Sequence, residues 1–211
     1  LGIGAHESNR MDIEGEDLPG VITAVEYLRK VGLGEKVDMG NRVVVIGGGF
    51  TAVDAARTSL RLGATDVTIA YRRSRTEMPA HRDEVDDAEH EGVKLELLAA
   101  PVRVIAENGH AKGIELQRMT LGEPDARGRR RPVPVPGSEF VIEADTIVAA
   151  IGQTPNVCFL DKEIGVKANE RKCIMVNPYS YQTDREKVFA GGDATIGAAT
   201  VIQAVAAGKL A

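Results

Sequence analysis

An apolar run that ends in three consecutive glycines constrains this chain more than any other feature. Residues 43–52 read VVVIGGGFTA, and the composition of the positions that follow favours a helix. Glycine lacks a Cβ, so it permits a tight turn and lets another group come close to the backbone. The stretch therefore predicts a buried strand, a tight turn, and the N-terminus of a helix whose first N–H groups can face an anion.

Three small residues of this turn fit the G-x-G-x-x-A form of the dinucleotide-binding fingerprint. Gly47 is expected to form the tight turn, Gly49 to let a pyrophosphate approach the backbone, and Ala52 to let the helix pack closely on the strand. A second strand is predicted about 20 residues further on, as the fingerprint requires. The alternative is a tight glycine turn that binds no ligand.

The pattern around the turn alternates between strands and helices, as is typical of an α/β fold with a parallel sheet. The elements predicted here are a helix over 20–31, strands at 42–46, 66–71 and 94–98, and helices over 51–62 and 79–91. The later part predicts short strands at 102–105, 113–119 and 140–142, a hairpin arm over 123–136, strands at 146–151 and 188–190, and a helix over 198–211. Together they predict a doubly wound, Rossmann-like domain with a small antiparallel meander.

The end of the second strand indicates which dinucleotide the turn prefers. A site for NAD usually places Asp or Glu there, where the carboxylate holds the ribose hydroxyls. This strand ends in Tyr71, Arg72 and Arg73, and its nearest carboxylate, Asp66, lies at the other end. Arginine forks match phosphate oxygens, so the pair suits a ribose 2′-phosphate. We therefore expect NADP(H); the alternative is a solvated basic loop.

A second glycine turn lies near the end of the chain. Residues 188–193 read VFAGGD, and a helix is predicted to begin near Ala198. Asp193 lies five residues before Ala198, too far to cap that helix, so its carboxylate could point at a ligand hydroxyl. The alternative is an Asx-type turn at the end of a strand.

Longer stretches of the chain resemble a known family. They are GEDLPGV (15–21), VVVIGGGFTAVDAARTSLRLGA (43–64), VTIAYRRSRTEMPA (67–80), LGEPDARGRRRPVPVPGSEF (121–140), DTIVAAIGQTPN (145–156) and VFAGGDATIGAATVIQAVAAGKLA (188–211). They are spread over nearly the whole chain and are more specific than the fingerprint alone. They resemble the NADPH- and FAD-binding small subunit of glutamate synthase, a module also found in dihydropyrimidine dehydrogenase and in electron-bifurcating ferredoxin:NADP oxidoreductases.

The resemblance implies an NADP(H)-binding domain over 21–152, inserted into an FAD-binding domain. Residues 1–20 would be a remnant and linker of the FAD domain, and 153–211 its C-terminal part. The cofactor-binding residues that the resemblance and the fingerprint imply are Gly47, Gly48, Gly49, Phe50, Thr51, Ala52, Arg72, Arg73, Gly152, Gly192, Asp193, Ala199, Thr200 and Val201. Asp193 would hold the ribityl chain of FAD, and Gly152 would lie where the chain crosses between domains. The family usually has Asn where this chain has Phe50.

The resemblance also implies that the chain is a fragment. The family's first FAD half, with its own glycine fingerprint, and its cysteine-rich iron–sulfur segment have no counterpart here. The FAD site is therefore expected to be incomplete and the fragment inactive by itself. In the parent protein the expected partner is a large catalytic subunit or a fused iron–sulfur domain.

The predicted activity is that of an oxidoreductase in which NADPH gives hydride to FAD and the electrons pass to iron–sulfur centres. Hydride transfer needs no protein acid or base, so no catalytic residue and no metal ligand is predicted. Two alternatives remain open, a non-enzymatic NADP(H)-binding module and the electron-input unit of a related reductase. A structural or docking domain with a vestigial site is a third.

Composition excludes several other classes. The 23 glycines have no three-residue period, so the chain is not collagen-like. Two cysteines cannot build a disulfide-rich scaffold and suit a reducing compartment, so we expect a cytoplasmic protein. No apolar run is long enough for a membrane span. The net charge of −5, from 26 basic and 31 acidic residues, does not favour binding to nucleic acid or to an anionic membrane.

Other polar motifs are given structural interpretations. Cys158 and Cys173 form no C-x-x-C motif, and the histidines have no metal-binding spacing. The arginines of the hairpin arm are interpreted as a solvated tip or a contact with a partner subunit; they are Arg127, Arg129, Arg130 and Arg131. No physical role is predicted for the run of Glu77, Met78 and Pro79.

Overall fold

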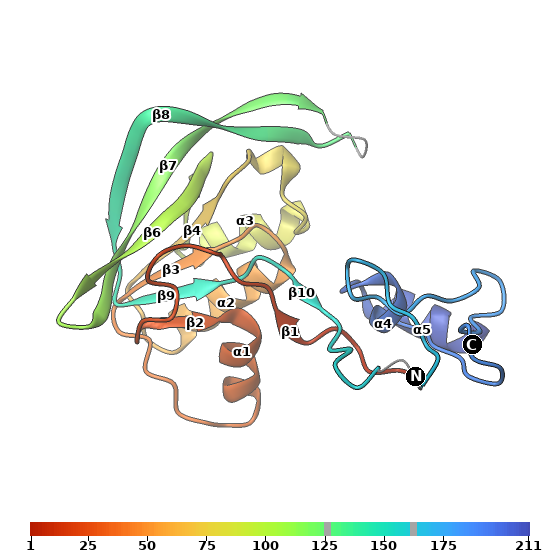
Figure 1. Ribbon diagram of the computed structural model, residues 1–211. Helices are drawn as coiled ribbons and strands as arrows, with labels where there is room; N and C mark the ends of the chain where they lie inside the picture. Colours follow the sequence, from red (N-terminus) through yellow and green to blue (C-terminus); the bar gives the residue numbers. More distant parts are fainter. Residues whose placement is uncertain (125–127, 161–163) are drawn as a thin grey trace. The chain divides into compact units, whose positions relative to one another are not determined.

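The computed structural model describes residues 1–124, 128–160 and 164–211, which form two compact units (Figure 1). The larger unit spans Arg10–Ile151, and the smaller unit combines Leu1–Asn9 with Gly152–Ala211. The sequence prediction placed the boundaries after residues 20 and 152, whereas the structure groups residues 10–20 with the larger unit.

The larger unit contains a parallel sheet, three helices and an antiparallel sheet. Its elements are β2 (Val21–Thr23), α1 (Ala24–Gly32), β3 (Arg42–Ile46), α2 (Phe50–Arg61), β4 (Asp66–Tyr71), the 3₁₀ helix η1 (Arg75–Glu77), α3 (Arg82–His90), β5 (Lys94–Leu97), β6 (Ala99–Glu107), β7 (His110–Pro124), β8 (Arg130–Glu143) and β9 (Thr146–Ala149). The parallel strands follow the order β2-β9-β3-β4-β5, and β6-β7-β8 form the antiparallel sheet. The α/β prediction with an antiparallel meander is confirmed, and β3 and β4 have the predicted bounds.

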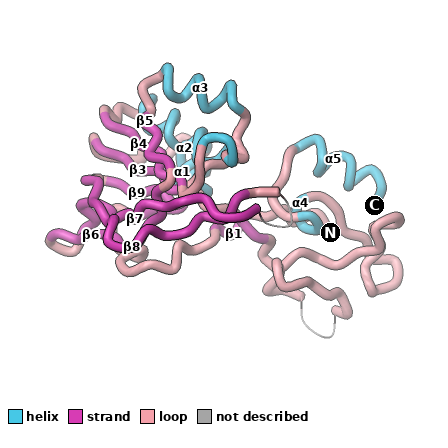
Figure 2. The backbone as a smooth tube through the Cα atoms, turned by 90° about the horizontal axis from the view of Figure 1, so that it is seen from above, coloured by secondary structure: helices cyan, strands magenta, loops and turns pink. Residues whose placement is uncertain are grey.

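Both faces of the parallel sheet are covered, which explains why the central strand β3 is apolar from Val43 to Ile46. Val43 and Val45 pack with the helices, whereas Val44 and Ile46 pack with the antiparallel sheet. Figure 2 shows the helices on one side of the strands and β7 and β8 on the other. Two hydrophobic cores therefore meet at this sheet and hold its strand ends in fixed positions.

The helix predicted over 20–31 is wrong at its start. Val21–Thr23 form β2, which pairs in parallel with β9, and the helix begins only at Ala24. The side-chain oxygen of Thr23 caps it by accepting a hydrogen bond from the Glu26 N–H at 3.3 Å. A strand of three residues is too short to show the two-residue period of a strand. Its apolar residues were therefore assigned to the helix that follows.

Other boundaries also differ from the predictions; for example, the helix predicted over 198–211 spans Val201–Leu210, and the strand predicted at 146–151 ends at Ala149. The helix placed over 79–91 begins at Arg82, and a 3₁₀ turn occupies Arg75–Glu77. The strands of the meander are much longer than predicted, because they continue through the polar and proline-rich arm. The strand predicted at 188–190 is reduced to an isolated bridge between Gln182 and Phe189.

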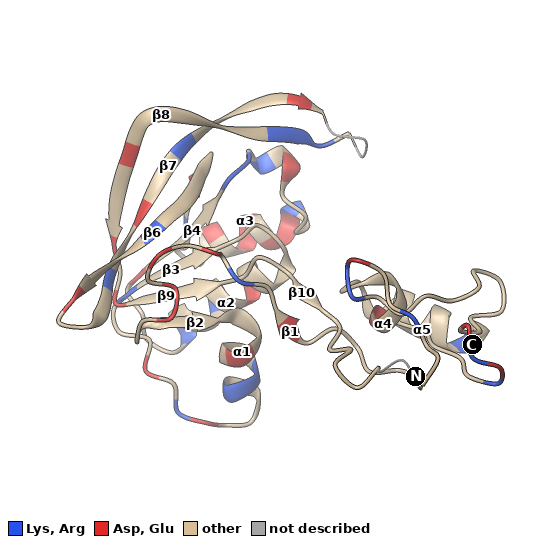
Figure 3. Ribbon diagram, in the orientation of Figure 1, with Lys and Arg blue, Asp and Glu red and all other residues tan. Residues whose placement is uncertain are grey.

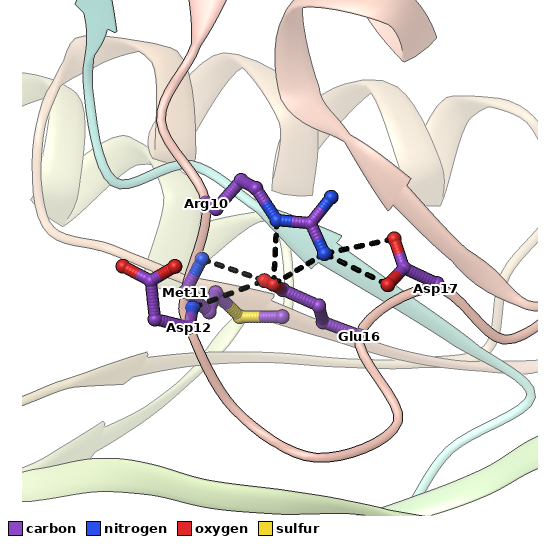
Figure 4. A network of polar contacts seen from close by, with 5 residues as sticks. All are labelled: Arg10, Met11, Asp12, Glu16 and Asp17. Atoms are coloured by element: carbon purple, nitrogen blue, oxygen red, sulfur yellow. Dashed lines mark hydrogen bonds and ion pairs between the residues drawn. The ribbon is translucent and has the colours of Figure 1, made fainter.

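A polar network orders the segment that enters the larger unit (Figure 4). The Arg10 guanidinium donates to the carboxylates of Glu16 and Asp17, and these contacts lower the pKa of Asp17. Glu16 also accepts the backbone N–H groups of Met11 and Asp12, at 2.8 and 3.1 Å. These contacts give the GEDLPGV stretch a structural role as an ordered turn.

The smaller unit has little regular structure. Its elements are β1 (Glu7–Ser8), β10 (Gln153–Thr154), α4 (Asp193–Ile196) and α5 (Val201–Leu210), with β1 and β10 paired antiparallel. A small core of Val166, Ile174, Ala190 and Ala194 holds it together. Across the described ranges of both units, no helix is long and apolar enough to cross a membrane.

Candidate functional site

The glycine turn joins β3 to α2, and its three glycines meet different surroundings. Gly47 has φ +148°, and a Cβ there would lie 2.2 Å from the carbonyl oxygen of Ala150. A Cβ on Gly48 would lie 2.6 to 2.8 Å from ring atoms of Tyr71. A Cβ on Gly49 would meet nothing within 4 Å. The protein therefore requires the first two glycines for its own packing, and the third faces open space.

That open space lies at the N-terminus of α2. Gly49 is the N-cap residue and has no side chain to cap the helix, and no acidic residue lies in the first turn. The first N–H groups of a helix lack intrahelical partners and carry partial positive charge. Ala52 is fully buried and lets the helix approach the sheet. The turn thus presents exposed backbone donors beside Phe50 and Thr51, in the arrangement that suits a pyrophosphate.

The arginines after β4 have different environments. Arg72 is exposed, and no ion pair or hydrogen bond engages its side chain within the described part of the chain. Arg73 is buried, and its Nε donates to the carbonyl oxygen of Arg130 at 2.9 Å. Arg75 pairs with two carboxylates of α3, Asp86 and Glu89. Arg72 is therefore the guanidinium that remains available at the tip of β4, next to the end of β3.

The segment after β4 folds back onto the glycine turn. The Glu77 carboxylate accepts the Ser74 N–H at 3.2 Å, and the Glu77 carbonyl accepts the Tyr71 hydroxyl at 2.8 Å. Further along, the Ala80 N–H donates to the Gly48 carbonyl at 3.2 Å. These bonds give the run of Glu77, Met78 and Pro79, which had no predicted role, the function of holding the tip of β4 beside the turn.

One residue near the turn was missed by the sequence analysis. The rings of Phe50 and His81 meet edge to face, with centroids 5.2 Å apart. His81 is the N-cap residue of α3, so the starts of α2 and α3 lie side by side. The available signal was Pro79, because proline is common at helix starts, but it did not locate the N-cap at His81.

The second glycine turn lies in the smaller unit and differs from the predicted arrangement. Asp193 is the first residue of the short helix α4, rather than a residue well before a single long helix. A Cβ on Gly191 would lie 3.2 Å from backbone atoms of Ala207, and Gly192 has φ +68°. The Oδ1 atom of Asp193 is buried and has no hydrogen-bond partner among the residues that the structure describes. Such an atom is costly unless a ligand supplies the missing donor.

A cavity of about 360 Å³ adjoins this carboxylate. Gly191, Gly192 and Asp193 line it together with Ala204 and the first residues of the chain. The residues implied near a flavin begin α5: Thr200 is its N-cap and bonds reciprocally with Gln203, while Ala199 and Val201 are exposed.

Gly152 has φ +105° and accepts the Asn9 N–H at 3.0 Å. It therefore joins the two segments that make up the smaller unit.

Metal and thiol chemistry find little support among the residues that the structure describes. No group of three or more His, Cys, Asp or Glu side chains there could hold a metal ion. Cys158 is exposed and Cys173 is buried, and burial raises the pKa of the Cys173 thiol. Arg127 of the hairpin arm lies outside the described residues.

Comparisons with known proteins agree with the fold. Residues 1–208 match the family described as pyridine nucleotide-disulphide oxidoreductase. The chain belongs to this family. It is 49% identical to the NADP(+)-dependent formate dehydrogenase subunit beta of Moorella thermoacetica, over 100% of this chain and 30% of the relative. It is 43% identical to the glutamate synthase [NADPH] small chain of Halomonas elongata, over 100% of this chain and 47% of the relative.

Solved structures share the fold at low sequence identity. Thioredoxin reductase of T. acidophilum matches with a TM-score of 0.75 and 24% identity, over 99% of this chain and 61% of that one. FprA of Mycobacterium tuberculosis, solved in complex with NADPH, matches with a TM-score of 0.76 and 18% identity, over 99% and 60%. This chain spans about a third to a half of the length of the curated relatives named above.

Proposed function

We propose that this oxidoreductase chain binds NADP(H) at the β3–α2 turn and that the bound nucleotide reduces FAD. The observation that carries the proposal is the pairing of the open Gly49 face with the free Arg72 guanidinium. β3 and β4 are adjacent parallel strands, with Ile46 opposite Ala70, so the turn and Arg72 lie at the same edge of the sheet. This is the edge at which ligands bind in open α/β sheets.

The preference for the phosphorylated nucleotide follows from the charges at that edge. The described chain offers no carboxylate at the end of β4 to hold ribose hydroxyls, and Glu77 is engaged by Ser74. Arg72 can form a charge-assisted hydrogen bond with the 2′-phosphate, which is worth about 1.5–3 kcal/mol. That energy corresponds to a preference of about 10- to 150-fold for NADPH over NADH.

The smaller unit supplies part of the proposed FAD site. Asp193 Oδ1 can accept a hydrogen bond from a ribityl hydroxyl, which would satisfy its unpaired oxygen. Gly191 and Gly192 keep side chains out of the adjoining cavity, so a flavin nucleotide could approach the backbone.

When bound, the two cofactors would supply the redox chemistry: the nicotinamide would donate a hydride and the flavin would accept it. The role of the chain is to bind and orient them. The N–H groups at the start of α2 would hold the pyrophosphate, Arg72 the 2′-phosphate, and Asp193 the ribityl chain. No side chain needs to move a proton at the reacting atoms.

The proposed electron acceptors lie in partner domains or subunits. The relatives' names include a formate dehydrogenase subunit, an NADPH-Fe(3+) oxidoreductase subunit and a glutamate synthase chain, which differ in their reactions. A shared module that exchanges electrons with NADP(H) and passes them to iron–sulfur centres accounts for this variety.

Calorimetric titration tests the nucleotide site. NADPH should bind more tightly than NADH, and Arg72→Met should weaken NADPH by about 10- to 150-fold while leaving NADH nearly unchanged. Arg29→Met, an exposed position on α1, is the matched charge control and should change neither affinity. Equal losses for both nucleotides in Arg72→Met would remove the 2′-phosphate assignment.

A second measurement tests the flavin. In a protein that contains this chain together with the rest of the FAD site, loaded with FAD, anaerobic NADPH should bleach the flavin absorbance. NADPH binding without bleaching would favour a non-enzymatic nucleotide-binding module.

A further inference from the structure

The hairpin formed by β7 and β8 reaches the tip of β4, where the structure gives it a direct connection. The Arg73 side chain is buried, and its Nε donates to the Arg130 carbonyl at the start of β8. Arg73 directly follows Arg72, so this bond places the start of β8 one residue along the chain from the free guanidinium. In Figure 3 the ribbon carries the colour of Lys and Arg both at the start of β8 and on the segment after β4.

Two further bonds tie the same places together through the backbone. The Leu98 N–H donates to the Arg73 carbonyl at 3.1 Å, and the Met119 N–H of β7 donates to the Leu98 carbonyl at 2.7 Å. Leu98 has φ +55°, which is unusual for a side chain of its size. The chain thus accepts backbone strain at the point where the antiparallel sheet meets the end of β4.

A side-chain hydrogen bond also joins the two strands of the hairpin near Arg130. The Arg130 guanidinium crosses to β7 and donates from Nη2 to the Leu121 carbonyl at 3.0 Å. Arg130 therefore binds β7 with its side chain and receives Arg73 with its carbonyl. Arg73 is therefore linked through Arg130 to both strands of the hairpin.

We propose that the described ends of this hairpin, residues 119–123 and 130–133, are a wall of the nucleotide site on its 2′-phosphate side. Arg73 is the positioning residue that holds this wall, and Arg72 is the residue that contacts the phosphate. This inference rests on the proposed NADP(H) site. Under this proposal the two adjacent arginines have separate roles, and the hairpin arm helps to form the nucleotide site of the larger unit.

Amide hydrogen exchange with and without nucleotide tests the proposal. NADPH at about 100 times its Kd suppresses openings that expel it by up to about 100-fold. Exchange should therefore slow in residues 47–52 and also in the two hairpin segments, and NADH should slow the hairpin less than NADPH. If NADPH slows residues 47–52 but leaves the hairpin unchanged, the inference is overturned and the proposed function stands. If it slows neither, the proposed function fails.

Variants at Arg73 separate positioning from phosphate contact. Arg73→Met keeps an apolar stem without a donor, so NADPH should still slow residues 47–52 but no longer the hairpin. Arg73→Lys restores one donor and should recover part of the hairpin effect, while Arg29→Met should behave as the unmodified protein. A hairpin response to NADPH that persists in Arg73→Met at full strength would contradict the positioning role. Should Arg73→Met not fold, the exchange of the unmodified protein still decides the proposal.

Discussion

Glycine-to-alanine substitutions in the β3–α2 turn add one methyl group each and should affect protein stability and nucleotide binding separately. Gly49→Ala adds a Cβ where nothing lies within 4 Å, and the residue has φ −93°, which alanine adopts readily. The small loss of N-cap preference is offset by reduced freedom of the unfolded chain, so the unfolding free energy should change by less than about 1 kcal/mol. The same methyl occupies the path of the pyrophosphate, and NADPH affinity should fall by about 10-fold or more.

Gly48→Ala is the matched comparison, because its methyl group points into the protein. The new Cβ would lie 2.6 Å from the Tyr71 ring, which is itself fixed by its hydrogen bond to Glu77. Overpacking of this kind costs about 1–3 kcal/mol. Denaturant unfolding measures the stability of both variants, and calorimetry measures their affinity for NADPH.

We expect the Gly49→Ala variant to be stable and to bind NADPH weakly, and the Gly48→Ala variant to be destabilised. A Gly49→Ala variant that binds NADPH like the unmodified protein would show that the open face of the turn is not the pyrophosphate site. Equal destabilisation by both substitutions would refute the distinction between packing and ligand access.

Three further predictions concern the remaining polar groups. Asp193→Ala removes a buried oxygen that lacks a partner, so the unfolding free energy should stay constant or rise while FAD binding, followed by equilibrium dialysis, weakens. The Arg42 guanidinium, aided by backbone N–H groups, holds the pKa of the Asp145 carboxyl at about 2, below its usual 3.8. Because folding lowers this pKa, the Asp145 carboxylate adds at most about 2 kcal/mol to the free energy of unfolding. This stabilisation is complete above about pH 4 and is lost as the pH falls toward 2. Asp145→Asn should therefore flatten that part of the acid unfolding curve. Ser59→Ala leaves the buried Tyr27 hydroxyl without its partner and should cost about 1–3 kcal/mol in denaturant unfolding, most of which Tyr27→Phe in the same chain should recover.

The central strands could be predicted from the sequence because both faces of the parallel sheet are buried. An uninterrupted apolar run such as Val43–Ile46 indicates that burial directly, and β3 and β4 have the predicted bounds. β2 could not be found in the same way. Its three residues acquire their conformation by pairing with β9, more than a hundred positions away, and such a contact leaves no local pattern.

The candidate site shows the same limit. The glycine fingerprint and the pair Arg72 and Arg73 are visible in the sequence because each consists of neighbouring residues with a known chemistry. The sequence does not reveal that Arg73 is occupied by the Arg130 carbonyl, since that bond joins residues far apart in the chain. It also does not reveal that Gly48 is required by Tyr71 rather than by a ligand.

The most direct test of the account is to map NADPH onto the protein by nuclear magnetic resonance. Backbone amide signals of the isotope-labelled chain would be followed during a titration with NADPH, with NADH as the comparison. The account predicts that the largest shifts occur at residues 47–52 for both nucleotides, and that Arg72 shifts strongly with NADPH alone. Shifts that avoid the glycine turn, or none at saturating NADPH, would contradict it.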